Sequence, residues 1–288
     1  RALTTRRTNL VHSRTGVKNR IHSILHQRLI SVPIKNETVF TPKGMAWLRD
    51  LDLDLAGRMA IESDLHLLRE LDRLINDIDQ VLAQKGYQDD RVKLLLTQPG
   101  VDVNVAQTVL AALGDISRFH DGDHAASYLG LVPSTRSSAN KCYHGPITKQ
   151  GRGPARWMMI QAAQHISKNP GPLGHFFRRL AKKKNRNVAV VATARKLVVI
   201  AWHMLTKGEP YRYAVPRTTR SKLSGLRTRA TGVRRRATPE TTPKERLKQE
   251  KGAPARNVPS IKAVLRSEAL PEPPPLAKGE LRMLTERG

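Results

Sequence analysis

The sequence predicts a mainly α-helical protein, and two observations carry that prediction. Over residues 60–85, apolar side chains recur at every third or fourth position, which places them on one face of a helix. No stretch alternates strictly between apolar and polar residues, the pattern of a half-buried strand. With 288 residues, the chain is long enough for one or two domains with their own cores.

The first predicted element is one basic helix over residues 1–30, in a segment that we delimit at 1–36. Its apolar positions repeat every seven residues, at Leu3, Leu10, Val17 and Ile24. Arginine and lysine fill much of the remaining surface of this helix. The segment ends at Pro33 and the polar residues that follow it.

Residues 37–90 form the second predicted segment, a helical linker that begins near Thr41-Pro42. Its long helix carries an apolar stripe at Ile61, Leu65, Leu68, Leu71, Ile75, Ile78 and Leu82. Such a stripe forms either a coiled coil between subunits or the face of a helix packed within its own domain, and the sequence leaves both open. Gly86 is predicted to cap the helix at its C-terminus.

The third segment, residues 91–213, is predicted to be a compact helical domain. Two helices flank Pro99-Gly100, as in a helix-hairpin-helix element whose turn amides hold a DNA phosphate, although any Pro-Gly turn between helices looks alike. A loop rich in serine, glycine and basic residues and then a helix are predicted within residues 125–165. Two more helices are predicted within residues 173–206.

The last segment, residues 214–288, is predicted to be a disordered basic tail. Ten prolines occur from Pro210 onward, and threonine, arginine and lysine dominate the composition. Such a segment lacks the apolar surface needed to offset the entropy of folding, and its charge attracts nucleic acid.

The charge pattern predicts a nucleic-acid partner. The formal net charge is +27. Between His124 and Gly208 the chain has fifteen lysines and arginines and no acid, and eight bases precede the first acid, Glu37. A basic surface without counter-charges of its own is typical of a protein that neutralises phosphates. In the first helix, Arg6, Arg7 and Arg14 are candidates for such contacts.

The single cysteine, Cys142, excludes an internal disulfide and a site built from several thiolates, and it fits a reducing cytoplasm. No signal peptide or apolar run of about 18–20 residues is evident, so no membrane partner is predicted. The spacing of His22 and His26 allows a metal pair, but exposure on a basic helix is the simpler interpretation. We therefore predict no metal site from the residues themselves.

An ordered series of short motifs carries a family resemblance that extends over about residues 1–213. Gly130-Leu131-Val132-Pro133 is followed by Arg136-Ser137-Ser138-Ala139, and then by Gly145-Pro146-Ile147-Thr148-Lys149-Gln150-Gly151-Arg152 and Arg156. Pro99-Gly100-Val101 and Gly114-Asp115 precede the series. The chain resembles the DEDD transposases of the insertion-sequence 110/116/902 group.

The resemblance implies that a serine attacks DNA and forms a covalent phosphoserine link. Ser138 fits that role best, and Ser137 is second. Taken alone, the residues would favour ordinary loop serines that cap a turn. The bases suited to neutralise the phosphate are Arg136, Lys141, Lys149, Arg152 and Arg156, and Gly100 is a candidate backbone contact.

The sequence departs from the family pattern at Ala139, where glycine is usual, and at Arg152, where asparagine is usual. The resemblance also implies an N-terminal RuvC-like domain whose four acids bind Mg²⁺. Those acids precede the helix that matches residues 1–30, so this chain is predicted to be truncated and to lack the magnesium ligands. We interpret Asp50, Asp52 and Asp54 as part of a solvated loop.

The sequence thus predicts an insertion-sequence transposase or recombinase. By resemblance it binds DNA and a structured RNA encoded by the element, forms a homo-oligomer, and lies in the cytoplasm of a bacterium or archaeon, at the nucleoid. Two alternatives remain. One is a non-catalytic DNA- or RNA-binding remnant of a truncated transposase gene, and the other is an RNA-binding protein of ribosomal type, against which the ordered motifs argue.

Binding to duplex DNA and RNA is expected to depend steeply on salt. If about six phosphates are contacted, the affinity should fall roughly a thousandfold between about 50 and 200 mM salt, because each neutralised phosphate releases counterions. Fluorescence anisotropy with a labelled duplex of arbitrary sequence measures this slope. A flat response to salt would contradict the nucleic-acid interpretation.

Overall fold

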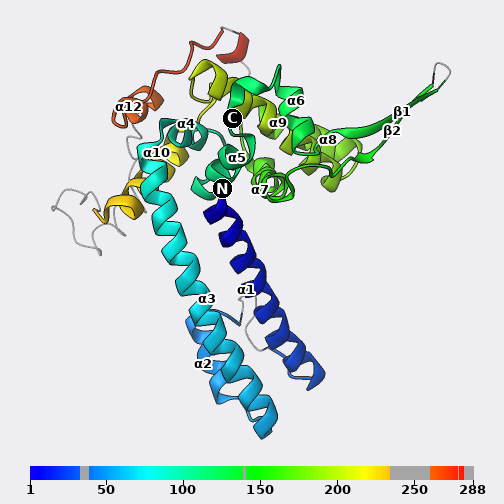
Figure 1. Cartoon of the computed structure of the whole chain (residues 1–288), viewed down its shortest axis with the longest axis vertical. Coiled ribbons are helices and arrows are strands. Elements are labelled where there is room, and N and C mark those ends of the chain that lie inside the picture. The colour runs from blue at the N-terminus through cyan, green and yellow to red at the C-terminus, as the bar shows by residue number, and fades with distance from the viewer. Residues whose placement is uncertain (33–38, 139–140, 234–259, 278, 282–288) are drawn as a thin grey trace, which may run out of the picture. The chain divides into compact units, whose positions relative to one another are not determined.

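The computed structural model describes residues 1–32, 39–138, 141–233, 260–277 and 279–281, and these are mainly helical, as the sequence predicts (Figure 1). The chain divides into two compact units, an N-terminal unit of residues 2–79 and a C-terminal unit of residues 80–288 together with Arg1. The predicted boundaries at 36/37, 90/91 and 213/214 therefore do not separate compact units. The one boundary between units falls within a long helix.

In the N-terminal unit, helices α1 (Ala2–Gln27) and α3 (Leu55–Gln88) pack against each other, and the short α2 (Pro42–Asp50) joins their core. Thr41 caps α2 by accepting a hydrogen bond from the Gly44 backbone N–H, with Pro42 in the first turn, as predicted. Gly86 does not end α3, which continues to Gln88.

The predicted apolar stripe of α3 is the core of the N-terminal unit. Its first five residues, from Ile61 to Ile75, are buried with four residues of α1, Leu10, Val17, Ile21 and Leu25. Ile78 packs against them partly buried, and Leu82 lies in the C-terminal unit. Of the two interpretations that the sequence left open, the structure thus favours packing within the domain. A second apolar row of α3, at Leu67, Leu74 and Val81, remains partly exposed.

A ladder of ion pairs fixes the direction and register of α1 against α3. Arg7 pairs with Asp79, Arg14 with Asp72 at 2.9 Å, and Arg20 with Asp64 at 2.6 Å. Because the numbers rise along α1 and fall along α3, the two helices are antiparallel. Exposed pairs contribute little individually to stability, but opposing charges at each step disfavour a shifted register.

The core of the C-terminal unit surrounds helix α9 (Arg186–Lys207). Helices α4 (Asp90–Leu96), α6 (Gly122–Tyr128), α7 (Gly153–Gln164) and α8 (Pro172–Lys183) contact it, and α5 (Val103–Leu113) packs on α4 and α7. Two short 3-10 helices, η1 (Ile116–Arg118) and η2 (His165–Lys168), complete the connections.

Helix α9 is, among the described residues, the one helix long and apolar enough to cross a membrane by length and composition. A buried core helix meets the same criteria, and 44% of its apolar window is buried inside the protein. Asn185 caps its start, and Gly208, with φ +67°, ends it in a left-handed conformation. We therefore interpret α9 as the core helix of its unit.

The prediction of a disordered tail over residues 214–288 is wrong for the parts that the structure describes. Residues Pro216–Thr231 form helix α10, and Ile261–Arg266 form helix α12. Both join the core of the C-terminal unit through Leu223, Leu226, Val264 and Leu265. These apolar residues at helical spacing supply a buried face that the basic, proline-rich composition conceals. Residues 234–259, 278 and 282–288 lie outside the described part of the chain.

Lys222 fixes helix α10 to the end of α4. Its Nζ donates hydrogen bonds to the carbonyl oxygens of Leu96 at 3.1 Å and Gln98 at 2.6 Å. Burial lowers the pKa of Lys222 to about 8, against a partly opposing attraction from Asp102. The neutral amine can still donate both hydrogen bonds, so the charge itself is the unfavourable feature of this contact.

Stability is therefore expected to rise with pH in the window from about 8 to 10.5, where the unfolded chain binds a proton that the folded chain does not. This gain, on the order of 3 kcal/mol by linkage, should be absent in Lys222→Met. Urea unfolding of both proteins between pH 7.5 and about 10 measures the difference. Lys207→Met, at an exposed position, is the control, and parallel curves for wild type and Lys222→Met would contradict the prediction.

Candidate nucleic-acid interface and serine hairpin

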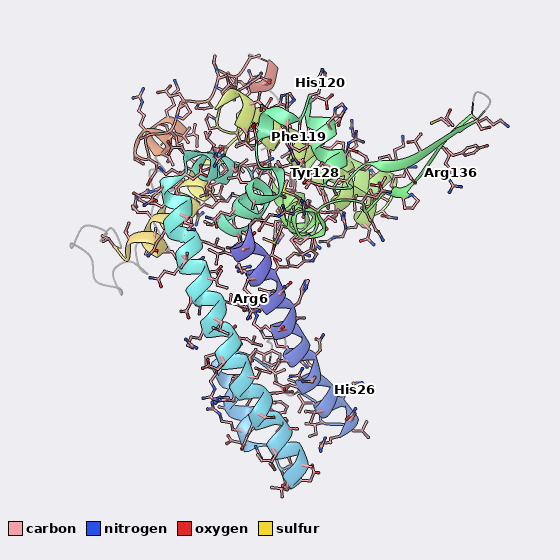
Figure 2. The ribbon with its side chains drawn as sticks, viewed as in Figure 1. Arg6, His26, Phe119, His120, Tyr128 and Arg136 are labelled. Carbon is pink, nitrogen blue, oxygen red and sulfur yellow. The ribbon has the colours of Figure 1, made fainter. Side chains whose placement is uncertain are left out.

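The segment that carries the candidate serines is a β-hairpin, where the sequence predicted a loop. Strand β1 (Pro133–Ser138) pairs antiparallel with β2 (Lys141–Ile147), and the two form the one sheet of the described residues. The hairpin extends away from the helices of its unit, with Arg136 near its far end (Figure 2). Its far half is exposed to solvent on both strands.

The register of the hairpin separates the two serines. Successive residues of a strand face opposite sides, and directly paired residues share a side. Ser138 pairs with Lys141 and Arg136 with Tyr143, so these four lie on one face. Ser137 pairs with Cys142 on the other face. Ser138 thus shares its face with two cations.

Two glycines form the joint at the base of the hairpin. Gly130 (φ +69°) and Gly151 (φ +83°) both adopt conformations that favour glycine. A Cβ on Gly130 would lie 2.2 Å from the Gln150 carbonyl oxygen, and one on Gly151 would lie 2.1 Å from that of Tyr128. The motif glycines are therefore required by close approach of two backbone turns.

Arg156 and Arg152 serve this joint rather than an open surface. Arg156 Nη1 donates to the carbonyl oxygens of Leu129 at 3.1 Å and Gln150 at 3.2 Å, one from each turn. Arg152 Nε donates to the hydroxyl of Tyr128 at 3.1 Å, and the Arg118 guanidinium lies over the same ring, 4.4 Å from its centroid. The sequence assigned both arginines to phosphate, whereas the structure gives them internal partners.

Lys149 remains a good candidate for a phosphate contact. Its side chain is exposed, and its backbone takes φ +56° at the edge of the joint. Together with Arg136 and Lys141 it brings three cations to the hairpin and its base.

The Pro99-Gly100 turn between α4 and α5 is a packing element. A Cβ on Gly100 would lie 2.4 Å from the Ala162 carbonyl oxygen, so the turn approaches α7 closely. The N-terminus of α5 is already capped by the carboxylate of Asp102, which accepts from Val105 N–H at 2.8 Å. An acid at that end disfavours an anion. The phosphate contact at Gly100 therefore stays a prediction, and this geometry does not favour it.

Of the candidate bases in α1, Arg7 and Arg14 are held in the ion pairs with α3 described above. Arg6 is exposed on α1 (Figure 2). The acids of α3 thus supply the counter-charges that the first 36 residues lack, and the uncompensated positive charge lies mainly in the C-terminal unit.

A basic and aromatic cavity between α8, α9 and the segment after α9 was not found from the sequence. Its volume is about 730 Å³, and its walls include Phe176, Arg179, Lys196 and Tyr213. The Lys196 ammonium lies 4.9 Å from the centroid of the Phe176 ring. Aromatic faces beside cations are the features that hold bases and phosphates of single strands. The alternation of these residues over two helices hides the pattern in the linear sequence.

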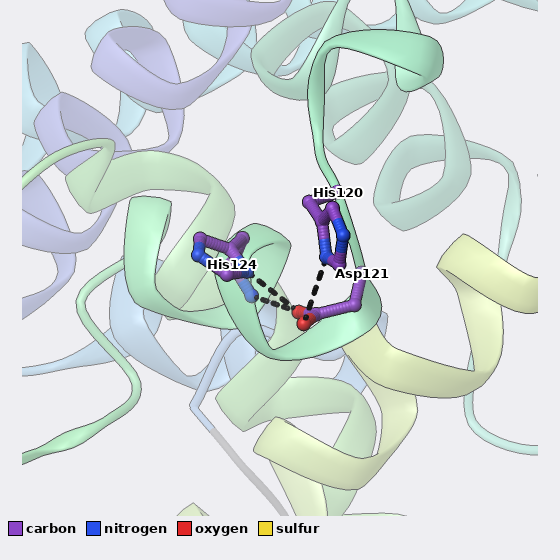
Figure 3. A group of neighbouring side chains, drawn as sticks. All are labelled: His120, Asp121 and His124. Carbon is purple, nitrogen blue, oxygen red and sulfur yellow. Dashed lines mark hydrogen bonds and ion pairs between the residues drawn. The ribbon is translucent and has the colours of Figure 1, made fainter.

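Three side chains that the sequence analysis did not select converge at the start of α6. His120, Asp121 and His124 place one ligand atom each within 4.8 Å of one another (Figure 3). Asp121 also caps α6, and the backbone N–H of His124, with its ring, lowers the pKa of the Asp121 carboxyl to about 2. The signal in the sequence is the spacing His-Asp-x-x-His. Its two histidines are four residues apart, as are His22 and His26, but here a carboxylate also lies between them.

The described residues do not fit the magnesium site that the family resemblance implies. Mg²⁺ prefers carboxylate oxygens and water, and the one group of three or more potential ligands found among the described residues contains two imidazoles. Asp54 is paired with Arg28 at 2.7 Å. Asp50 and Asp52 do not join it in such a group. Asp50 is the last residue of α2 and not a loop residue, whereas Asp52 lies in the loop before α3.

Comparison with known proteins tests the family resemblance. Residues 92–176, which span α4 to α8 and contain the hairpin, match the family described as Transposase IS116/IS110/IS902 family. The chain therefore carries a domain of the insertion-sequence transposase class. The particular family is the one that the motifs predicted, and the resemblance is confirmed.

Curated relatives extend the similarity beyond that domain. The chain is 27% identical over 224 residues to the transposase for insertion sequence element IS1111A of Coxiella burnetii, covering 72% of this chain and 58% of the relative. It is 28% identical over 226 residues to an IS116 insertion-element protein of Streptomyces clavuligerus, covering 75% and 54%. A pilin gene-inverting protein of Moraxella bovis is 27% identical over 149 residues, covering 51% and 46%. The chain thus spans little more than half of the first two relatives.

Two substitutions distinguish a residue that stabilises the joint from a residue that contacts DNA. Arg156→Ala should lower thermal stability, by roughly 2 kcal/mol, because the carbonyls of Leu129 and Gln150 lose a charged donor. Lys149→Ala should leave stability unchanged within about 0.5 kcal/mol and weaken DNA binding with a smaller salt slope. Calorimetry and anisotropy on both variants test the assignment. An unchanged melting temperature for Arg156→Ala would return that residue to the phosphate-binding set.

Proposed function

We propose that this chain is the part of an insertion-sequence transposase that binds DNA and supplies the serine nucleophile for strand cleavage and recombination. The observation that carries the proposal is the exposed hairpin on which Ser138 shares a face with Arg136 and Lys141. Its position inside the matched transposase domain supports the same reaction class. The name of the pilin gene-inverting relative supports recombination as the outcome.

In the proposed reaction, the Ser138 hydroxyl oxygen attacks the phosphorus of a phosphodiester. The new Ser–O–P ester forms as the bond from phosphorus to one sugar oxygen breaks, and that oxygen leaves with a proton. Arg136 and Lys141 stabilise the charge that develops on the phosphoryl oxygens. The resemblance implies Mg²⁺ for the complete family protein, but the described residues do not fit it, so we derive no step through the metal.

Nucleic-acid binding is proposed to extend from the hairpin over the basic surface of α8 and α9. Helices α8 and α9 lie within the fifteen-base, acid-free stretch, and the cavity beside them combines aromatic rings and cations with one acid, Glu209. Backbone recognition of this kind suits DNA and also a structured RNA from the element, which we propose as the second partner. Such partners would place the protein in the cytoplasm, at the nucleoid.

Self-association is a further part of the proposal. The buried stripe of α3 is used within its own unit, but Leu67, Leu74 and Val81 form a row with a seven-residue repeat on the same helix. A partly exposed row at this spacing is the seam that a second helix covers in a coiled coil. It supports a homo-oligomer through α3.

Ser138→Ala is expected to abolish the covalent protein–DNA adduct in a protein that joins this chain to the N-terminal domain of a relative. DNA affinity should stay within about threefold, since a neutral hydroxyl adds little to phosphate binding. Denaturing gel electrophoresis with end-labelled DNA detects the adduct. This chain without such a domain is expected to bind DNA and not cut it.

Ser137→Ala is the matched control, because it changes the same atoms on the opposite face of the hairpin. Loss of the adduct in Ser137→Ala alone would exchange the roles of the two serines. If neither substitution removes the adduct, the serine mechanism is wrong. An adduct that never forms in the restored wild type would favour the second candidate, a non-catalytic DNA- or RNA-binding remnant.

A further inference from the structure

We propose that His120, Asp121 and His124 bind one divalent transition-metal ion at the start of α6, with Zn²⁺ the best fit. This site is separate from the magnesium site that the family resemblance implies, and it does not depend on the proposed transposition activity. The inference rests on the convergence of three potential ligand side chains at one place on the surface (Figure 3).

The ligand set selects the ion. Two imidazole nitrogens and one carboxylate oxygen suit Zn²⁺, Co²⁺ and Ni²⁺, whereas Mg²⁺ and Ca²⁺ prefer oxygen ligands alone. The ligand atoms already lie within 4.8 Å of one another. Ligands at about 2.0–2.1 Å from zinc in a tetrahedral arrangement lie roughly 3.4 Å apart, so small side-chain rotations close the site.

The carboxylate of Asp121 joins the two histidines. His124 Nδ1 lies 2.8 Å from Asp121 Oδ1, and His120 Nδ1 lies 3.6 Å from Asp121 Oδ2. Both rings thus present a nitrogen to the same carboxylate from either side, as Figure 3 shows. A metal ion can take the place of the proton shared between a ring nitrogen and a carboxylate oxygen, leaving both as ligands.

The local fold holds the three residues in place. Asp121 accepts the backbone N–H of His124 at 2.8 Å, which fixes the first turn of α6 and the spacing of the two ligands. Asp123 in the same turn pairs with Arg195 of α9 at 2.9 Å, which ties that turn to the core helix. All three ligands are on the surface, so an ion can enter directly, and water or a phosphate oxygen can complete its coordination.

A bound ion would stiffen the segment that leads to the serine hairpin. Helix α6 runs from Gly122 to Tyr128, and its last residue belongs to the joint at the base of the hairpin. Binding to the folded protein alone also raises its apparent stability. The site therefore gives the domain a structural metal dependence distinct from catalysis.

The test is titration of the purified chain with Zn²⁺ by calorimetry and with Co²⁺ by visible absorption. One ion should bind per chain. Removing a direct ligand should weaken binding at least as much as removing a residue behind one, which costs about tenfold or more. Both His120→Ala and His124→Ala should show this loss, together with loss of the Co²⁺ absorption.

Asp121→Asn separates a metal ligand from a helix cap, because asparagine caps as well as aspartate but has no charged carboxylate. This variant should keep its helical circular dichroism and lose at least about tenfold in Zn²⁺ affinity. His26→Ala is the control, since His22 and His26 form an exposed pair on α1 outside any group of three described ligands. Equal Zn²⁺ binding by wild type, His120→Ala and Asp121→Asn would overturn the proposal, as would the absence of a one-to-one site in the wild type.

Discussion

The close approach of two backbone turns at Gly130 and Gly151 is the constraint on which the serine hairpin depends. Each turn lies so near a carbonyl of the other that a methyl group does not fit between them, and both glycines take positive φ. Arg156 then donates one hydrogen bond to each turn. Because the strands leave directly from this joint, its rigidity sets the direction in which Ser138 is presented.

Charge is distributed differently from what the linear sequence suggests. The basic first helix contains no acids, but α3 returns antiparallel to it and brings an aspartate opposite three of its arginines, Arg7, Arg14 and Arg20. A fourth pair joins Arg28, just after α1, to Asp54, just before α3. The N-terminal unit is therefore largely compensated. The stretch between His124 and Gly208 contains no acid, and it includes the hairpin and helices α8 and α9, which form much of the cavity wall. Glu209, just after this stretch, also lines the cavity.

The helices could be predicted because apolar residues recur in them at helical spacing. This is clearest in α3, whose predicted stripe packs in the core of the N-terminal unit. The hairpin could not be predicted, because the outer half of β1 reads Thr-Arg-Ser-Ser and is fully exposed. A strand without a buried face does not show the alternation of apolar and polar residues. The packing of α10 was missed because Leu223 and Leu226 lie among many basic residues. The overall composition of the segment therefore does not reveal its apolar face.

The candidate site could be predicted only in part, because sequence motifs do not show which partners a side chain has. Motif letters identify Ser138 and the glycines, but they cannot separate an arginine that binds a phosphate from one that binds two carbonyls, because both need a guanidinium. Only the fold shows that Arg156 has internal partners and that the Pro-Gly turn is packed against Ala162. The histidine cluster was missed because the sequence alone does not show that the first turn of α6 brings Asp121 close to both His120 and His124.

The hairpin also constrains how its serine can be activated. A serine hydroxyl is a weak nucleophile unless a base or a metal removes its proton. Residues 133–147 contain no aspartate or glutamate, and their one histidine, His144, pairs with Thr135 on the face of Ser137. The residues paired around Ser138 on its own face are Arg136, Lys141 and Tyr143. Those cations can stabilise a phosphate and the charge it develops, but they cannot accept the proton. If Ser138 is the nucleophile, we expect the group that activates it to come from another part of the assembled protein. A serine on an exposed projection can then stay unreactive until such an assembly forms around the DNA.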